Sequence, residues 1–247
     1  MRLREFDGAL LLEALHAARH ALRGLARGVL VAPPQRCAAN AAAASPQTQP
    51  PFTALQSHRH ASTMTICVVL VASVDSQLEQ EILDAGSEYQ HLAGLPKALL
   101  PVSGGKRVLD YWWTAIESQR QISDVYLVTN AKSFKHFERW ATARGLPSQN
   151  VVNDGTTTRA SSLGAARDLL LALNRCGYNN DRDVVVVAGD SLFHREFDLA
   201  ALVADQHVRA GSSLAVSYRL AQGELASSRG VVEVDERTRR VTRFVEK

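Results

Sequence analysis

Short runs of β-branched residues alternate along most of this chain with segments whose apolar residues recur at helical spacing. The run at 184–188, VVVVA, is apolar at every position, which is typical of a strand buried on both faces at the centre of a parallel sheet. A second such run, TICVVLVA, spans 65–72. Shorter strands are predicted at 124–129, 149–152 and 214–220, and a β-hairpin at 230–235 and 241–245.

Helical periodicity fills the intervals between these strands. Helices are predicted near 109–117, 133–143, 161–173 and 199–208. Strands separated by helices of about 10 to 15 residues favour right-handed crossovers, which produce a parallel sheet with helices on both faces. The predicted fold class is therefore α/β, a Rossmann-like three-layer α/β/α arrangement with a mostly parallel sheet. The hairpin would add an antiparallel portion at one edge.

Residues 1–63 follow a different pattern and are predicted to be an extension rather than part of this fold. Leucine and alanine residues at helical spacing predict an amphipathic helix within residues 1–30. Residues 31–63 hold five of the eight prolines and no acidic residue, which is typical of a disordered, low-complexity segment. The predicted functional domain covers residues 64–247, and Met64 is a candidate start of the functional polypeptide.

The extension also bears on localisation. Arginine-rich amphipathic N-termini are typical of organelle-targeting presequences, but Glu5, Asp7 and Glu13 are more acidic residues than such segments usually carry. The three cysteines are scattered without a CxxC pair, which favours a reducing compartment. No apolar run reaches the ~18 residues of a membrane helix. We therefore expect a cytoplasmic protein without a membrane span, with organelle targeting as the alternative.

Composition and charge are those of an ordinary globular protein. Hydrophobic residues make up 46% of the chain and charged residues 21%, with a net charge of +3 at pH 7. The positive excess lies in residues 1–63, which hold seven arginines against three acidic residues, so the remainder is nearly neutral. The sequence therefore predicts no nucleic-acid-binding surface. Whether the chain forms a homo-oligomer stays open.

The strand at 184–188 ends at Gly189 and Asp190, and two interpretations of this carboxylate are open. Open α/β sheets bind ligands at the carboxyl ends of their strands, where Asp190 could hold a hard cation such as Mg²⁺. Glycine beside it would let a ligand approach the backbone closely. Alternatively, Asp190 caps the turn that leads into the next helix.

Five sequence landmarks together resemble one family. They are GLPKALLPV at 94–102 with GGK at 104–106, LDY at 109–111, NDGT at 153–156, AGD at 188–190 and FVEK at 244–247. In this order and context they resemble the sugar-1-phosphate nucleotidyltransferases, whose fold is the nucleotide-diphospho-sugar transferase, or GT-A-like, variant of the predicted architecture. The likeness covers residues 65–247.

This resemblance implies an activity and its partners. Such enzymes transfer a nucleotidyl group from a nucleoside triphosphate to a sugar 1-phosphate, or a similar phosphorylated alcohol, and release pyrophosphate. The resemblance implies Mg²⁺ as the cofactor, with Asp190 as its ligand. It also implies that Lys97 is a catalytic cation beside the triphosphate. Transfer at phosphorus depends mainly on positioning and on neutralising negative charge, which suits this pair. As the alternative, Lys97 is a solvated loop lysine.

Further binding residues follow from the same resemblance. Ser73, Ser76 and Gln77 would contact the nucleotide phosphates, and Asn153 and Gly155 the nucleobase. Glu246 and Lys247 would bind the sugar and its phosphate. Asn153 and Gly155 also suit an ordinary turn that starts a helix, and the two terminal residues could equally be frayed.

The phosphate loop departs from the family pattern. Active relatives have Gly-X-Gly-Thr-Arg-Leu after the first strand, where this chain has SVDSQL at 73–78. Both glycines are absent, Asp75 adds a carboxylate, and Gln77 replaces an arginine. Each unit-charge change some 4 Å from a phosphate is worth on the order of 4 kcal/mol at an effective dielectric constant of about 20. These changes would abolish catalysis unless Lys106 or Arg107 supplies the missing charge.

The end of the sequence leaves a second alternative open. Family members continue beyond Glu-Lys with further sheet and a second metal-binding aspartate, so we expect the domain to be incomplete at its C-terminus. An altered phosphate loop without that aspartate would also suit a catalytically silent nucleotide-binding or regulatory module of the same fold.

Overall fold

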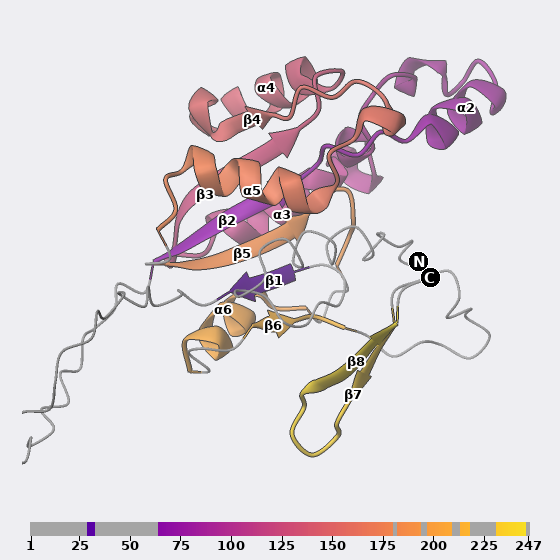
Figure 1. The fold of residues 1–247 in the computed structure, drawn as a ribbon. Helices are drawn as coiled ribbons and strands as arrows, with labels where there is room; N and C mark the ends of the chain where they lie inside the picture. The colour runs from indigo at the N-terminus through magenta and orange to yellow at the C-terminus, as the bar shows by residue number, and fades with distance from the viewer. Residues whose placement is uncertain are drawn as a thin grey trace, which may run out of the picture.

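A mostly parallel sheet of six strands forms the centre of the molecule (Figure 1). The computed structural model describes residues 29–32, 64–179, 182–193, 197–208, 213–217 and 231–245. In spatial order the strands are β4 (Val151–Asn153), β3 (Ile122–Thr129), β2 (Thr65–Leu70), β5 (Asp183–Ala188), β1 (Val29–Ala32) and β6 (Leu214–Ala215). The first four run parallel to one another, and β1 pairs antiparallel with both β5 and β6.

The central strands β2 and β5 are buried on both faces, as the unbroken apolar runs predict. Alternate residues point to opposite faces of a strand and divide the core into two clusters. One cluster contains Cys67, Val69, Val185 and Val187, packed with residues of α3 (Val108–Glu117), α4 (Phe134–Thr142) and α6 (Leu199–Val208). The other contains Ile66, Val68, Val184 and Val186, packed with α5 (Ala165–Arg175). The predicted three-layer α/β/α class is confirmed.

Helix α2 (Ser76–Asp84) was not predicted from the sequence. None of its residues is buried, and its three apolar residues, Leu78, Ile82 and Leu83, are too few to reveal a helix in the sequence. Asp75 starts it by accepting a hydrogen bond from the Leu78 backbone amide at 3.0 Å. The segment that resembles a phosphate loop therefore continues directly into a short surface helix.

The antiparallel part of the sheet differs from the prediction. The hairpin of β7 (Val231–Val234) and β8 (Val241–Val245) forms a separate two-stranded sheet, so its expected place at the edge of the main sheet was wrong. Its residues are exposed or half-buried and present no buried face that would require such pairing. Strand β1 instead pairs with the edge of β5. This corrects the sequence prediction, in which residues 29–30 were helical and residues 31–32 were disordered.

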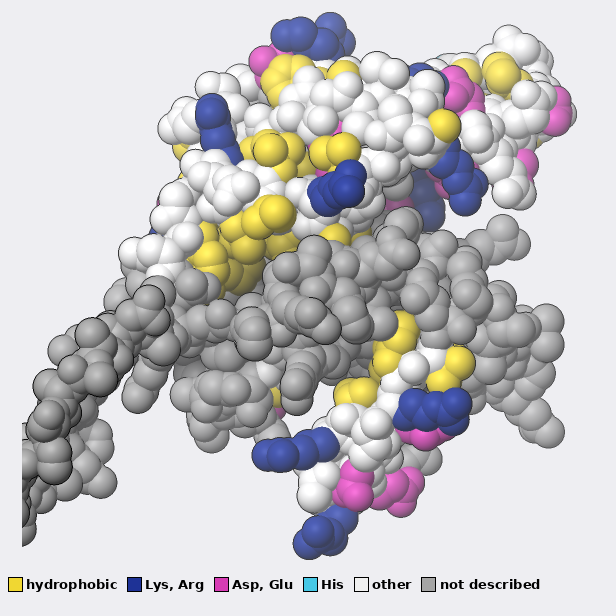
Figure 2. Space-filling model, viewed as in Figure 1, with side chains coloured by type: hydrophobic (Ala, Val, Ile, Leu, Met, Phe, Trp, Pro, Cys, Tyr) yellow, Lys and Arg dark blue, Asp and Glu magenta, His cyan; other side chains and the backbone are white. Residues whose placement is uncertain are grey.

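Other predictions for the extension lie outside the described residues, since only 29–32 of residues 1–63 are described. Strand β6 covers Leu214–Ala215 of the predicted 214–220, and residues 218–220 are likewise outside the described part. On the face seen in Figure 2, lysine and arginine side chains of the described residues lie at separate points rather than in one patch. This distribution fits the near-neutral charge of residues 64–247.

Gly189 joins β5 to the site at the edge of the sheet, and its lack of a side chain is a packing requirement. Its amide donates to the Leu70 carbonyl at 3.0 Å, which keeps the turn against β2. A Cβ atom here would lie 2.6 Å from Val71 Cγ1 and 2.7 Å from Val69 Cγ1. No side chain can occupy this position without displacing core residues of β2.

We expect Gly189→Ala to destabilise the protein by about 1–3 kcal/mol, the usual cost of overpacking a core. Urea denaturation followed by circular dichroism measures the change. Adding Val71→Ala to Gly189→Ala should recover part of the loss, because it removes the nearest clashing atom. A Gly189→Ala variant as stable as the wild type would contradict the packing argument.

Candidate functional site

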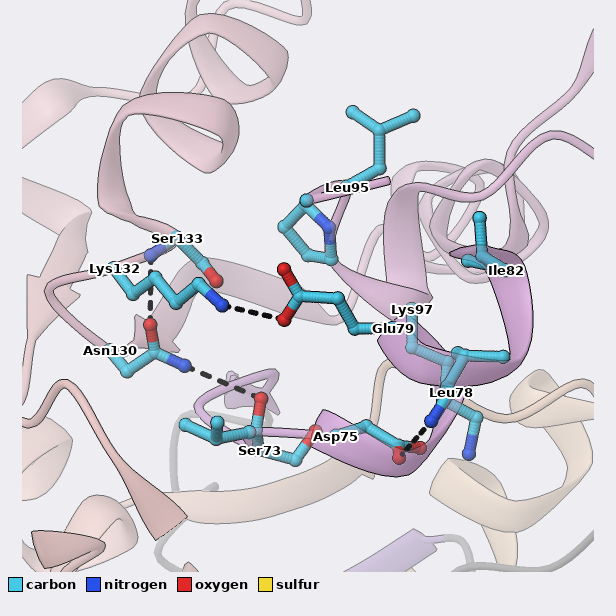
Figure 3. A pocket seen from close by; sticks show the side chains of 13 residues that line it. Ser73, Asp75, Leu78, Glu79, Ile82, Leu95, Lys97, Asn130, Lys132 and Ser133 are labelled. Atoms are coloured by element: carbon cyan, nitrogen blue, oxygen red, sulfur yellow. Dashed lines mark hydrogen bonds and ion pairs between the residues drawn. The ribbon is translucent and has the colours of Figure 1, made fainter. Parts of the chain in front are cut away.

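A cleft opens at the carboxyl ends of β2 and β3 (Figure 3). Residues of three segments line it: 73–75 after β2 with the α2 residues Leu78, Glu79 and Ile82, the loop 94–97, and Asn130, Lys132 and Ser133 after β3. Parallel strands direct their carboxyl ends to one edge of a sheet, so these loops meet although they are far apart in sequence.

Asp190 is the buried carboxylate beside this cleft. It is 7% exposed, and its Oδ2 lies 3.6 Å from the Lys97 ammonium and 3.5 Å from the Ser73 hydroxyl, which donates to it. Burial raises the pKa of Asp190, while Lys97 and the hydrogen bonds to the carboxylate act in the opposite direction. Three residues singled out in the sequence thus come together from three separate segments.

Local structure fixes both charged partners. Lys97 opens a 3-10 turn, Lys97–Leu99, whose other two residues are buried in the core and anchor the turn. The preceding residue, Pro96, has an extended backbone conformation that leads the chain into this turn. Beyond Asp190, the Trp112 indole donates to the Ser191 carbonyl at 2.7 Å and packs against Phe193 at 4.6 Å between ring centroids. Trp112 was not predicted as a site residue, because its role depends on a contact across 79 positions.

The altered phosphate loop is only partly directed into the cleft. Ser73 and Asp75 line the cleft, whereas the exposed Ser76 and Gln77 are not among its described lining residues. The Gln77 amide instead donates to Glu81 at 3.0 Å along α2. The structure therefore does not bring Ser76 and Gln77 together with Asp190.

Asn130 is a positioning residue that the sequence analysis missed. Its side chain is buried and donates to the carbonyls of Ala72 at 3.0 Å and Ser73 at 3.3 Å. Its Oδ1 accepts from the Ser133 amide at 2.8 Å (Figure 3). One side chain thus ties two walls of the cleft together. A buried strand that ends in asparagine, VYLVTN, was the available signal.

Two lysines, Lys97 and Lys132, face the cleft. Lys132 Nζ contacts Glu79 Oε2 on α2 at 2.7 Å. Among the described residues, Lys106 and Arg107 do not line the cleft, although the sequence offered them as replacements for the missing arginine. Lys106 lies over the ring of Tyr111, at 5.4 Å from its centroid.

The loop after β4 carries Asn153 and Gly155, both exposed. Asn153 Oδ1 accepts from the Gly155 amide at 2.9 Å, and Gly155 has a φ of 80°, which favours glycine. Hydrogen bonds from Asp154 N to Thr129 O and from Ala131 N to Thr156 O attach this loop to the end of β3. Turn formation accounts for these residues, and a ligand role for them remains a prediction.

Beneath this loop, Asp168 of α5 forms a carboxyl pair with Asp154. Burial raises the pKa of Asp168 to about 7, helped by the charge of Asp154 and by a hydrogen bond between the two groups. Asp168 Oδ1 has no hydrogen-bond partner among the described atoms. Two carboxyl groups can share a hydrogen bond only if one of them is protonated, and here that group is the buried Asp168.

The remaining predictions concern the terminal residues, metals and membranes. Glu246 and Lys247 lie outside the described residues. Within the described part of the chain, no three histidine, cysteine or acidic side chains gather as a ready-made metal site. None of the helices described is both long and apolar enough to cross a bilayer.

Comparison with known proteins gives consistent matches. The sequence model of the family named nucleotidyl transferase matches residues 93–247. Two curated relatives are the glucose-1-phosphate adenylyltransferases of Arthrobacter sp. strain FB24 and of Pseudarthrobacter chlorophenolicus. Each is 29% identical over 177 residues, which cover 67% of this chain and 37% of the relative. The chain thus spans well under half the length of these relatives.

The Asp168 pair predicts a stability that depends on pH. With its pKa raised to about 7, folded Asp168 keeps a proton that the unfolded chain loses near pH 4. Unfolding then takes less free energy as the pH rises toward 7, and the contribution levels off above it. Asp168→Asn, which can still donate to Asp154, should be more stable than the wild type at pH 8, by on the order of 3 kcal/mol, and similar to it at pH 4.

Urea denaturation at pH 4, 5, 6, 7 and 8 measures this difference. Asp84→Asn, on exposed α2, is the matched control for removing one carboxylate and should follow the wild type. Parallel pH profiles for Asp168→Asn and the wild type would show that Asp168 holds no such proton.

Proposed function

Because the chain belongs to the nucleotidyl transferase family, we propose that it transfers a nucleotidyl group from a nucleoside triphosphate to a phosphorylated acceptor. The acceptor class we propose is a sugar 1-phosphate or a similar phosphorylated alcohol, and the second product is pyrophosphate. The names of the curated relatives make glucose 1-phosphate and ATP the first pair to test. The observation that carries this proposal is the meeting of Ser73, Lys97 and Asp190 at one edge of the sheet.

In the proposed reaction, an oxygen of the acceptor phosphate attacks the α-phosphorus of the nucleotide. The bond from that phosphorus to the bridging oxygen of the β-phosphate breaks, and pyrophosphate leaves with the electron pair. Negative charge spreads over the phosphate oxygens as this happens. The Lys97 ammonium, whose side chain is 32% exposed, can turn from Asp190 toward these oxygens and neutralise part of that charge.

The donors present fit a magnesium ion. Mg²⁺ in proteins is usually held by one or two carboxylates together with substrate phosphates and waters, and it does not need a cage of protein ligands. Asp190 offers one buried carboxylate, with the Ser73 hydroxyl beside it. When bound there, the ion would neutralise phosphate charge and help to align the two substrates.

The outer parts of the site are assigned by the same proposal. Asn153 and Gly155 would contact the nucleobase from a loop that hydrogen bonds attach to β3. Glu246 and Lys247 would bind the sugar phosphate. Residues 64–247 would supply most of this catalytic domain, to which β1 (Val29–Ala32) adds a strand, and the rest of residues 1–63 would be an extension.

One observation favours a second candidate, nucleotide binding without turnover. The Asp75 carboxylate lines the cleft where phosphates would enter, and Gln77 offers them no charge. A module of this kind would bind Mg²⁺–nucleotides but release no pyrophosphate. Calorimetric binding and a pyrophosphate assay on the same preparation separate the two candidates.

Pyrophosphate release should require Asp190. We expect Asp190→Asn to lower the rate at least 100-fold with Mg²⁺, four nucleoside triphosphates and a panel of sugar 1-phosphates, because it removes the buried carboxylate proposed to hold the ion that neutralises phosphate charge. Glu138→Gln, on the exposed surface of α4, is the control and should keep full activity. Absence of release by the wild type across the whole panel would exclude the enzymatic proposal for this chain.

Restoring the charges of the family loop should raise activity. The double variant Asp75→Gly, Gln77→Arg removes one carboxylate from the cleft, adds one cation and keeps the Ser73 hydroxyl beside Asp190. We expect a rate at least tenfold above that of the wild type in the same assay. Glycine is tolerated as a helix cap, so α2 should lose only a few tenths of a kcal/mol. An unchanged or lower rate in a folded double variant would mean that the charges of this loop do not limit the reaction.

A further inference from the structure

Lys132 faces the same cleft as Lys97, although the two residues come from different segments of the chain. Lys132 follows β3, and its side chain reaches across to α2, where Nζ lies 2.7 Å from Glu79 Oε2 (Figure 3). Among the described residues, these two lysines are the cations that line the cleft. Lys97 is engaged with Asp190, so Lys132 is the other positive charge within reach of a ligand.

The ion pair between Lys132 and Glu79 is easily exchanged. Their side chains are 47% and 37% exposed, and ion pairs in such settings contribute about 0–1 kcal/mol. Glu79 lies in the first turn of α2, where the helix dipole favours a negative charge even without a partner. A ligand that carries several negative charges can therefore replace Glu79 as the partner of the Lys132 ammonium with little loss of free energy.

The backbone beneath Lys132 is held in place by its neighbours. Asn130 binds the carbonyls of Ala72 and Ser73 and accepts from the Ser133 amide. The Ala131 amide donates to Thr156 at 2.8 Å. Hydrogen bonds thus fix Asn130 and Ala131, the two residues before Lys132, to the loops that surround the proposed nucleotide site. Only side-chain torsions need to change for the ammonium to leave Glu79.

The acidic side chains of the cleft must be offset by a cation if the cleft is to bind a polyphosphate. Asp75 and Glu79 both line it and repel a polyphosphate, while Gln77 is neutral and bonded to Glu81. We propose that Lys132 binds the polyphosphate of a nucleoside triphosphate, exchanging its partner Glu79 for phosphate oxygens when the nucleotide enters. The identity of this ligand rests on the proposed function. Lys132 would supply the positive charge that the loop 73–78 lacks.

Titration calorimetry on the full chain tests this inference with Mg²⁺ and ATP, CTP, GTP or UTP, their monophosphates, and inorganic tripolyphosphate. Lys132→Met removes the charge and keeps the stem of the side chain. We expect about tenfold weaker binding of the triphosphate that the wild type prefers, and of tripolyphosphate, as for one lost charge-assisted contact. The matching monophosphate should lose less than about twofold. Lys132→Arg should keep most of the affinity.

Two further variants separate ligand binding from a structural role. Lys135→Met is the matched control, because Lys135 also pairs with a glutamate, at 2.8 Å to Glu138, but lies outside the cleft lining. It should bind every probe like the wild type. Glu79→Gln frees Lys132 and should bind triphosphate at least as tightly as the wild type. If the ion pair were only structural, Glu79→Gln and Lys132→Met would weaken binding alike.

The outcomes distinguish this inference from the proposed function. The inference is overturned if Lys132→Met binds all probes like the wild type, or if it loses affinity for monophosphate and triphosphate equally. In either case, turnover by the wild type would still support the proposed function. Tripolyphosphate binding that depends on Lys132, in a wild type without turnover, supports the inference while the enzymatic proposal fails. A wild type that binds neither a triphosphate nor tripolyphosphate overturns the inference.

Discussion

The parallel pairing of β2 with β5 is the interaction on which the rest of the site depends. The two strands pair over their whole lengths, from Thr65 opposite Asp183 to Leu70 opposite Ala188, and both are buried by helices on either face. Because they run parallel and in register, they end together, and Ser73 meets Asp190 across 117 positions of sequence. Gly189 keeps the turn close enough for this contact by leaving room for the side chains of β2.

The fold could be predicted from the sequence where burial imposes a periodic pattern. The strands predicted at 65–72 and 184–188, found at 65–70 and 183–188, and helices α3, α4 and α5 are of this kind. Helix α2 could not be predicted in this way, since it buries nothing, and β1 could not, because its pairing depends on a distant edge of β5. Of the candidate site, the pairing of Lys97 with Asp190 was implied by the family resemblance, and the structure places the two side chains 3.6 Å apart. Asn130 had only a weak local signal, its place at the end of a predicted strand, and the contact of Lys132 with Glu79 is tertiary and leaves no local pattern.

The environment of Asp75 changes the electrostatic argument made from sequence. From the sequence alone, the Asp75 carboxylate was treated as a full negative charge beside the nucleotide phosphates. In the folded chain it caps α2, so one of its oxygens accepts the Leu78 amide and its charge interacts favourably with the helix N-terminus. Its repulsion toward an incoming phosphate is therefore smaller than the bare Coulomb figure, although it still lines the cleft. The cap also means that replacing Asp75 changes helix stability together with charge.

The order of the strands along the chain has a consequence for how the site is assembled during synthesis. Ser73, Lys97, Asn130 and Lys132 all precede α5, and β2, β3 and β4 can pair with one another before β5 exists. A nascent chain can thus form the lining of the cleft, with Lys97, Lys132, Asp75 and Glu79, before the buried carboxylate of Asp190 has been synthesised. Asp190 joins them only when β5 docks on the open side of β2. Long-range parallel pairing of this kind is slow, so the arrival of Asp190 at the site belongs to the late steps of folding.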